Sequence, residues 1–151
     1  MNLTSTYFYT ATILNWIPLL TDNDFKKIIS ESLIFLVSRN KVRVYGFVIM
    51  PNHIHFIWRN LETNGKELPH ESFMKFTAHE FKKKIGKTKI PKDQFMVNKI
   101  NRKYQFWQRS ALPVEIFSKE MLEQKLEYMH LNPLQRHWNL VDNPNDYLFS
   151  S

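Results

Sequence analysis

Two histidines separated by one residue stand in the segment VYGFVIMPNHIHFIWRN, residues 44–60, whose other residues are largely β-branched or aromatic. Such residues are typical of a strand, and strand side chains alternate between the two faces. His53 and His55 therefore point to one side and Ile54 to the other. Two imidazoles on one side can hold a divalent metal ion between them. A half-exposed strand whose imidazoles bond to neighbouring groups is the alternative.

Two histidines rarely hold a metal ion alone, so a third ligand has to come from another element. The segment between Glu31 and Glu62 contains no further carboxylate. Near the end of the chain, Tyr128 and Asn132 stand four residues apart in a helical pattern, which makes them neighbours on the helix surface. They could bring a phenol and an amide to the same place. The alternative is a tyrosine at the edge of the core and an asparagine that ends the helix before Pro133.

Positive charge is concentrated in one part of the chain. The formal net charge is +7, and eleven lysines and arginines lie between Lys75 and Arg109, against the two acidic residues Glu80 and Asp93. Aromatic residues are interleaved with them. This combination suits the phosphate backbone and the unstacked bases of a nucleic acid. A solvated helix face followed by an exposed lysine-rich loop is the alternative.

The composition indicates one globular domain over residues 1–151. Hydrophobic residues make up 43% of the sequence and aromatic residues 15%, enough for a proper core. The absence of cysteine excludes disulfides, thiolate metal sites and a cysteine nucleophile. We see no secretory signal and no apolar run of the roughly 20 residues that a membrane span needs. We therefore expect a cytoplasmic protein that does not bind a membrane.

The positions of strand and helix patterns indicate an α+β fold. Propensity and spacing predict strands over residues 5–17, 41–50 and 53–60, helices over 21–40, 70–86 and 118–132, an exposed connection over 87–103 and a partly extended segment over 104–117. Strands joined by hairpins, with helices gathered on one face, predict a two-layer sandwich.

Three motifs resemble those of a known family. GFVIMPNHIHFIW resembles the signature strand of the single-tyrosine HUH transposases, in which two histidines flank one bulky hydrophobic residue. FWQRS followed by EMLEQKLEYMHLNPLQ resembles the C-terminal half of the REP-associated branch, where the nucleophile stands in a Tyr-x-x-x-Asn helix that leads into Asn-Pro. The final NPNDYLFSS resembles the segment that follows in that branch, so the likeness extends from Phe8 to Ser150. The order of these motifs is more specific than any one of them.

The resemblance implies a ferredoxin-like α+β sandwich of the HUH endonuclease type, with an antiparallel sheet and helices on one face. It implies a transposase that cleaves and rejoins single-stranded DNA near hairpins through a 5′-phosphotyrosine formed by Tyr128. His53, His55 and Asn132 would hold a divalent ion, Mg²⁺ or Mn²⁺, and no nucleotide cofactor would be needed. Since a free phenol has a pKa of about 10, the charge of the ion would assist its attack.

The concentrated positive charge and its aromatic residues indicate how this DNA would be held. The DNA-binding residues that we predict are Lys82, Lys83, Lys84, Arg102, Lys103, Trp107 and Arg109. For Trp107, packing in the core is the alternative to stacking on a base. The partners would be single-stranded or hairpin DNA and a second copy of the chain in a homodimer. ALPVEIF departs from the family pattern after FWQRS, so no role is carried to it. LQRHWNL departs from it after Asn132–Pro133, which affects the details of DNA recognition more than the chemistry.

Two other functions stay open from the sequence. One is a catalytically silent protein of the same fold that binds hairpin DNA. The other is an unrelated metal-dependent phosphodiesterase, in which His53 and His55 hold the ion and Tyr128 is structural. A covalent protein–DNA adduct distinguishes the transposase from both, because only a tyrosine nucleophile leaves one.

Overall fold

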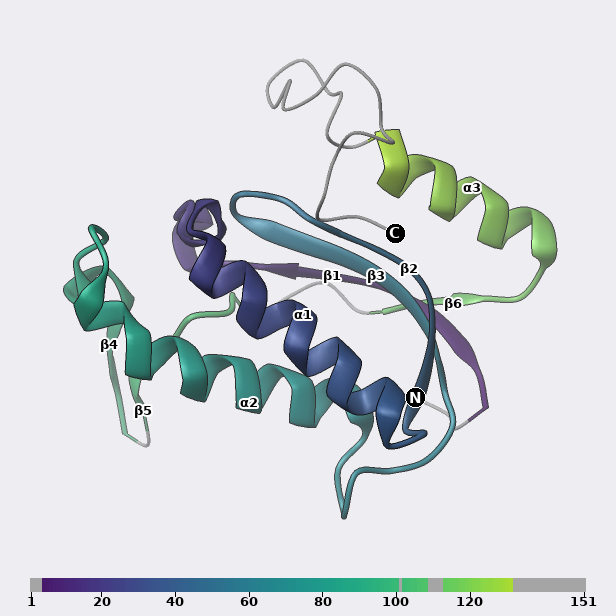
Figure 1. The fold of residues 1–151 in the computed structure, drawn as a ribbon, viewed down its shortest axis with the longest axis horizontal. Coiled ribbons are helices and arrows are strands. Elements are labelled where there is room, and N and C mark those ends of the chain that lie inside the picture. Colours follow the sequence, from purple (N-terminus) through teal and green to yellow (C-terminus); the bar gives the residue numbers. More distant parts are fainter. Residues whose placement is uncertain (1–3, 101, 109–112, 132–151) are drawn as a thin grey trace.

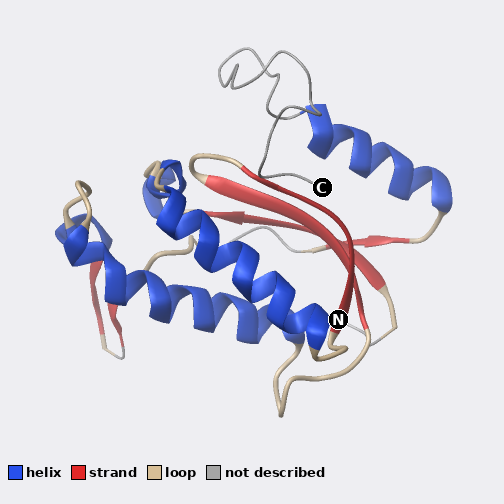
Figure 2. Ribbon diagram, in the orientation of Figure 1, coloured by secondary structure: helices blue, strands red, loops and turns tan. Residues whose placement is uncertain are grey.

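A four-stranded antiparallel sheet forms the centre of the molecule (Figures 1 and 2). The computed structural model describes residues 4–100, 102–108 and 113–131. The strand order is β2-β3-β1-β6. The strands are β1 (Thr6–Thr12), β2 (Val42–Ile49), β3 (His53–Asn60) and β6 (Val114–Ile116). The neighbours of β3, the strand that carries both histidines, are therefore β1 and β2.

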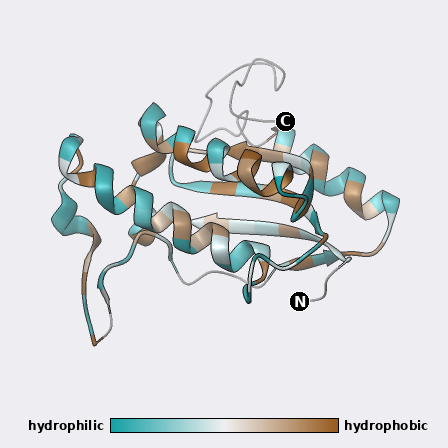
Figure 3. Ribbon diagram, turned by 60° about the horizontal axis from the view of Figure 1, so that its bottom comes forward, coloured by the Kyte–Doolittle hydropathy of each residue, from teal (hydrophilic) through white to brown (hydrophobic). Residues whose placement is uncertain are grey.

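Two long helices, α1 (Asn23–Ser38) and α2 (Pro69–Lys84), cover one face of this sheet. The Asp22 carboxylate caps α1 by accepting a hydrogen bond from the backbone N–H of Asp24 at 2.8 Å. In α2, proline occupies the first turn, where its missing N–H costs nothing. Hydrophobic and hydrophilic residues alternate along both helices (Figure 3). Their apolar sides meet the sheet in the main core, where Phe25 and Phe81 pack together with a ring-centre separation of 5.4 Å.

The third helix, α3 (Lys119–Leu131), lies over the opposite face of the sheet and contacts β2 and β3 (Figure 1). Among the described residues of α3, Met129 is the one that is fully buried. The Met129 side chain belongs to a second, smaller core cluster with Phe8, Val48, Met50 and Ile57. This cluster fixes where the exposed side of α3 stands above the sheet.

Met129→Ala is expected to lower the free energy of unfolding by about 2–5 kcal/mol, because the removed atoms leave a cavity under α3. Urea denaturation followed by circular dichroism measures the change. Met96 is 50% exposed, so the matched variant Met96→Ala should change the same quantity by less than about 0.5 kcal/mol. Equal effects of the two variants would mean that α3 does not depend on this cluster.

The predicted α+β sandwich with an antiparallel sheet is confirmed, and α1 and α2 share one face as expected. The prediction that helices lie on one face is wrong for α3, whose apolar side packs on the other face. The predicted connection over 87–103 is also wrong in part. It contains β4 (Met96–Lys99), which pairs with β5 (Arg102–Tyr104) in a separate two-stranded sheet. The pattern around β4 did not show this pairing, because both strands are short and largely exposed.

No helix in residues 4–100, 102–108 and 113–131 is long and apolar enough to cross a membrane. The cytoplasmic location and the single domain over residues 1–151 stay predictions.

Candidate active site

The two histidines of β3 point toward the face that α3 covers. In the sheet register, His53 stands beside Thr12 and His55 beside Thr10, both on β1. The ring centres of His53 and His55 are 4.9 Å apart, with the ring planes at 74°. His55 is only 5% exposed, whereas His53 is half-buried. The expected placement of both rings on one side of the strand is therefore observed.

Polar neighbours hold both imidazoles at their Nδ1 atoms. Asn52 Oδ1 lies 2.9 Å from His53 Nδ1. Because an amide oxygen only accepts, His53 Nδ1 carries the hydrogen, and in the neutral ring Nε2 carries the lone pair that a metal ion requires. Thr10 Oγ1 lies 2.9 Å from His55 Nδ1 and fixes the orientation of that ring without selecting its tautomer. Such partners are typical of metal-binding histidines.

The pKa of the His55 imidazole is lowered to about 3, and burial is the largest cause. The neighbouring His53 and, to a smaller extent, Lys125 add to the lowering, and a backbone hydrogen bond with Tyr9 opposes it. His55 is therefore uncharged at neutral pH. The uncharged imidazole is the form that binds a metal ion.

Tyr128 of α3 packs against His55. Its ring centre is 5.4 Å from that of His55 and 6.2 Å from that of Phe8, both in edge-to-face arrangements. The Tyr128 side chain is nonetheless 46% exposed, so its phenol is accessible from outside. Within one chain, the structure therefore brings Tyr128 next to His55, although the two residues are 73 positions apart in the sequence.

Lys125 is a site residue that the sequence did not reveal. Its Nζ atom lies 4.9 Å above the centre of the Phe8 ring, and Phe8 in turn stacks on His55 with ring centres 5.2 Å apart. Lys125 precedes Tyr128 by three residues, so the two side chains lie on the same side of α3. The three-residue spacing could identify Lys125 as a site residue only after Tyr128 is known to face the histidines.

The donor set fits a divalent ion of the kind that the resemblance implies. The two neighbouring imidazoles would supply nitrogen ligands, and an oxygen ligand would have to come from another group. In the described part of the chain, no group of three histidine, cysteine, aspartate or glutamate residues clusters as a metal site would. Asn132, the predicted third ligand, lies outside the described residues.

The predicted DNA-binding lysines and arginines lie mainly in α2 and β5. Lys82, Lys83 and Lys84 form the last turn of α2. Lys82 Nζ lies 5.3 Å above the ring centre of Tyr104, and Lys83 forms an exposed ion pair with Glu80 at 3.3 Å. Arg102 and Lys103 belong to β5, and Arg109 lies outside the described residues. The end of α2 and the start of β3 lie toward the same end of the sheet, at the left in Figure 1.

Trp107 is a core residue, which corrects its prediction as a base-stacking residue. It is 7% exposed and packs on Phe81 with a ring-centre separation of 5.6 Å. Its indole N–H donates to Thr77 Oγ1 at 2.9 Å. The ring faces are occupied by the protein, so the core alternative explains this residue.

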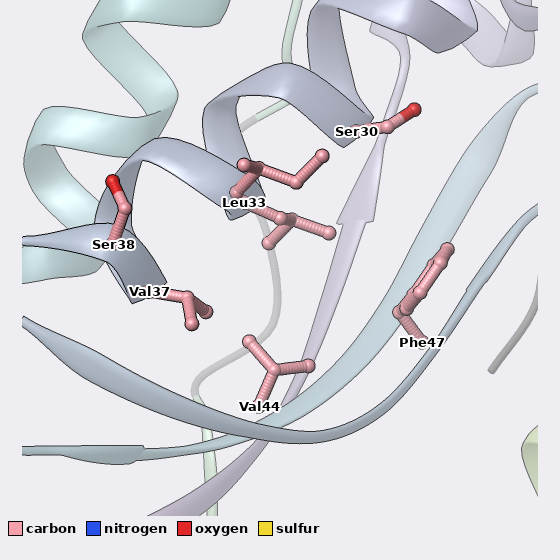
Figure 4. Close-up of a pocket in the computed structure, with 7 residues that line it drawn as sticks. Ser30, Leu33, Val37, Ser38, Val44 and Phe47 are labelled. Carbon is pink, nitrogen blue, oxygen red and sulfur yellow. The ribbon is translucent and has the colours of Figure 1, made fainter. Parts of the chain in front are cut away.

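An apolar pocket of about 400 Å³ opens between α1 and β2 (Figure 4). Its lining includes Leu33, Val37, Val44 and Phe47, on the sheet face away from the histidines. The Ser30 hydroxyl at its rim donates to the Lys26 carbonyl of the same helix. This lining presents no pair of groups suited to phosphate chemistry, unlike the site between β3 and α3.

Comparison with known proteins supports the fold. No protein-family model matches the sequence, and no curated protein does. Among solved structures, a REP-associated tyrosine transposase bound to a REP hairpin is similar, with a TM-score of 0.68 and 19% sequence identity. The similarity covers 99% of this chain and 77% of that chain. The chain therefore has the mixed α+β fold of that transposase structure.

Proposed function

We propose that the chain is a tyrosine transposase that cleaves and rejoins single-stranded DNA near hairpins, with a divalent ion at its site. The observation that carries this proposal is the exposed Tyr128 phenol against His55 on the sheet face opposite α1 and α2. The transposase fold supports it, and the solved relative was bound to a REP hairpin. The positive charge of the chain supports DNA as the substrate class.

Tyr128 would act as the nucleophile. Its phenol oxygen forms a bond to a backbone phosphorus, and the bond from that phosphorus to the 3′ oxygen breaks. The phenol gives up its proton, and the departing 3′ oxygen takes one up from solvent to become a hydroxyl. The phosphotyrosine bond retains the free energy of the original linkage, so the reverse attack by a 3′-hydroxyl rejoins DNA without ATP.

His53, His55 and Asn132 would hold Mg²⁺ or Mn²⁺. When bound, the ion would offset negative charge that develops on the phosphate and its leaving oxygen. Asn52 and Thr10 would keep the two imidazoles oriented for this task. Lys125, held over Phe8 beside the site, would add a fixed positive charge near the reacting phosphate. A homodimer stays part of the proposal.

The lysine run of α2 is proposed to bind the DNA backbone. Replacing Lys82, Lys83 and Lys84 together with alanine is expected to weaken binding to single-stranded DNA, because each phosphate that a lysine neutralises releases counterions. The slope of log K against log salt should fall in magnitude by about 0.7 for each phosphate that is no longer neutralised. Fluorescence anisotropy across a salt series measures both quantities.

The matched control for this variant replaces three lysines outside this run, Lys27, Lys66 and Lys119. If that control lowers the slope as much as the change in α2, the effect is one of net charge alone. The lysine run then has no specific place in DNA binding.

A gel assay tests the proposed reaction. The protein and Mn²⁺ are incubated with hairpin oligonucleotides that carry a label at either the 5′ or the 3′ end, and the products are separated under denaturing conditions. A 5′-phosphotyrosine puts the 3′ label on the protein and releases the 5′-labelled fragment. Cleavage without an adduct would indicate a phosphodiesterase, and binding without cleavage would indicate a silent DNA-binding protein.

A further inference from the structure

Trp16 is held in an unusual and exposed position at the end of β1. It lies in a 3-10 turn, η1 (Leu14–Trp16), and its side chain is 62% exposed. Asn15 and Trp16 both have left-handed backbone angles, with φ of 54° and 56°. That region is sterically costly for a residue as bulky as tryptophan. A strained conformation of this kind persists only where surrounding contacts impose it, and such residues gather at ligand-binding sites.

The contacts that impose this turn come from two sides. The Asn15 backbone N–H donates to Gln108 Oε1 at 3.0 Å, and the Leu14 N–H donates to the Phe106 carbonyl at 2.8 Å. On the other side, the Ile13 N–H donates to the Asn52 carbonyl at 2.8 Å. The turn is therefore fixed between the 105–108 segment and the loop before β3. The fold holds the Trp16 indole outward although burying it would be favourable.

Asn52 joins this turn to the candidate active site. Its Nδ2 atom donates to the Trp16 carbonyl at 3.3 Å, while its Oδ1 atom lies 2.9 Å from His53 Nδ1. One amide thus connects the backbone of Trp16 with one of the two imidazoles. The exposed residue Trp16 consequently has its backbone beside the amide that orients His53, at the end of the sheet where β3 begins.

We propose that Trp16 is a stacking platform for an unpaired base of the DNA strand that enters the histidine–tyrosine site. The proposal rests on the proposed function and names a residue that positions its substrate. An indole face stacks on any base, and such contacts contribute much of the affinity for single strands. The rigid link through Asn52 would set the distance between the stacked base and the phosphate at the site. The positive charge of the chain supplies the accompanying attraction for the backbone.

Binding measurements with a non-cleaving protein test this role. Tyr128→Phe protein is first used to select a hairpin from a DNA pool with randomised stem and flanks. Fluorescence anisotropy of the selected hairpin, carrying a label, then gives its Kd for the protein. In this background, Trp16→Leu is expected to raise Kd by about tenfold, whereas Trp16→Tyr keeps a ring face and should change Kd by less than about threefold. Phe76 is 51% exposed on α2, so Phe76→Leu serves as the matched control with no change. Thermal unfolding establishes that the variants are folded.

Abasic substitution identifies the stacked base. Each nucleotide of the single-stranded flanks is replaced in turn by an abasic residue, and Kd is measured for the protein that retains Trp16 and for the W16L variant. One abasic position should weaken binding by about tenfold in the presence of Trp16 and have little further effect in W16L. Equal Kd values for the two proteins, or additive losses at every position, would overturn the stacking role.

These binding measurements, together with the assay for the covalent adduct, distinguish a failure of the stacking role from a failure of the proposed function. If wild-type protein forms the covalent adduct while W16L binds the selected hairpin with unchanged Kd, the stacking role is wrong and the transposase proposal stands. If no hairpin is selected and no adduct forms, both are wrong.

Discussion

Tyr128→Phe is expected to abolish the covalent protein–DNA adduct, lowering its rate of formation by a factor on the order of 10⁴ or more. The variant removes only the phenol oxygen, and the aromatic contacts of the Tyr128 ring with His55 and Phe8 are kept. The fold and the affinity for hairpin DNA should therefore be unchanged. Quantifying the protein-linked label on a denaturing gel measures the adduct, and anisotropy measures the affinity.

Tyr45→Phe is the matched control for this variant. Tyr45 is a partly exposed tyrosine at the irregular position of β2, with 37% of its surface accessible. Its replacement should leave adduct formation at the wild-type rate. An adduct that persists in Tyr128→Phe would show that another group attacks the phosphate.

His53→Ala and His55→Ala are each expected to weaken Mn²⁺ binding by more than about 100-fold, since loss of a direct ligand should exceed the 10- to 100-fold effect of losing an orienting partner. Strand cleavage should fall in parallel. Isothermal titration calorimetry with Mn²⁺ measures the affinity in the absence of DNA, so the result does not depend on turnover. Removing the ion from wild-type protein with a chelator should stop cleavage in the same way.

His79→Ala is the control for the histidine variants, because His79 is exposed on α2, across the sheet from the site. It should bind Mn²⁺ as the wild type does. If His55→Ala keeps the wild-type affinity for Mn²⁺ and remains folded, the imidazole pair is not a metal site. Its close packing would then be structural.

The position of the two histidines could be predicted from sequence because strand alternation has a fixed period. With a period of two, His53 and His55 must share a face, whatever the rest of the fold does. The Tyr128 and Asn132 spacing likewise follows from helix geometry. The placement of α3 over that face required information that local periodicity does not contain. The resemblance implied that Tyr128 works with the two histidines, but the sandwich it implied put the helices on one face, which is wrong for α3.

The neighbours of the histidines could not be predicted, because they depend on strand register and loop path. Thr10 faces His55 only through the antiparallel pairing of β1 with β3. Asn52 reaches His53 and Trp16 at once because the loop before β3 folds against the turn after β1. Neither relation leaves a periodic signal in the sequence.

For Trp107, the composition of the surrounding sequence led to a wrong prediction. A tryptophan among lysines and arginines suggests a base-stacking residue, yet hydrogen bonding to Thr77 and packing on Phe81 place it in the core. Composition reports which residues are near in sequence, whereas burial depends on the direction that each side chain takes. Among the described residues, the exposed tryptophan is instead Trp16, in a segment whose sequence is mostly apolar.

Peptide mapping of the trapped adduct tests directly whether Tyr128 is the nucleophile. Wild-type protein is reacted with hairpin DNA and Mn²⁺, the linked DNA is trimmed with nuclease, and the tryptic peptides are sequenced by mass spectrometry. We expect a nucleotide joined through its 5′-phosphate to the peptide of residues 126–136, on Tyr128. A nucleotide on any other residue, or cut DNA with no modified peptide, would contradict it.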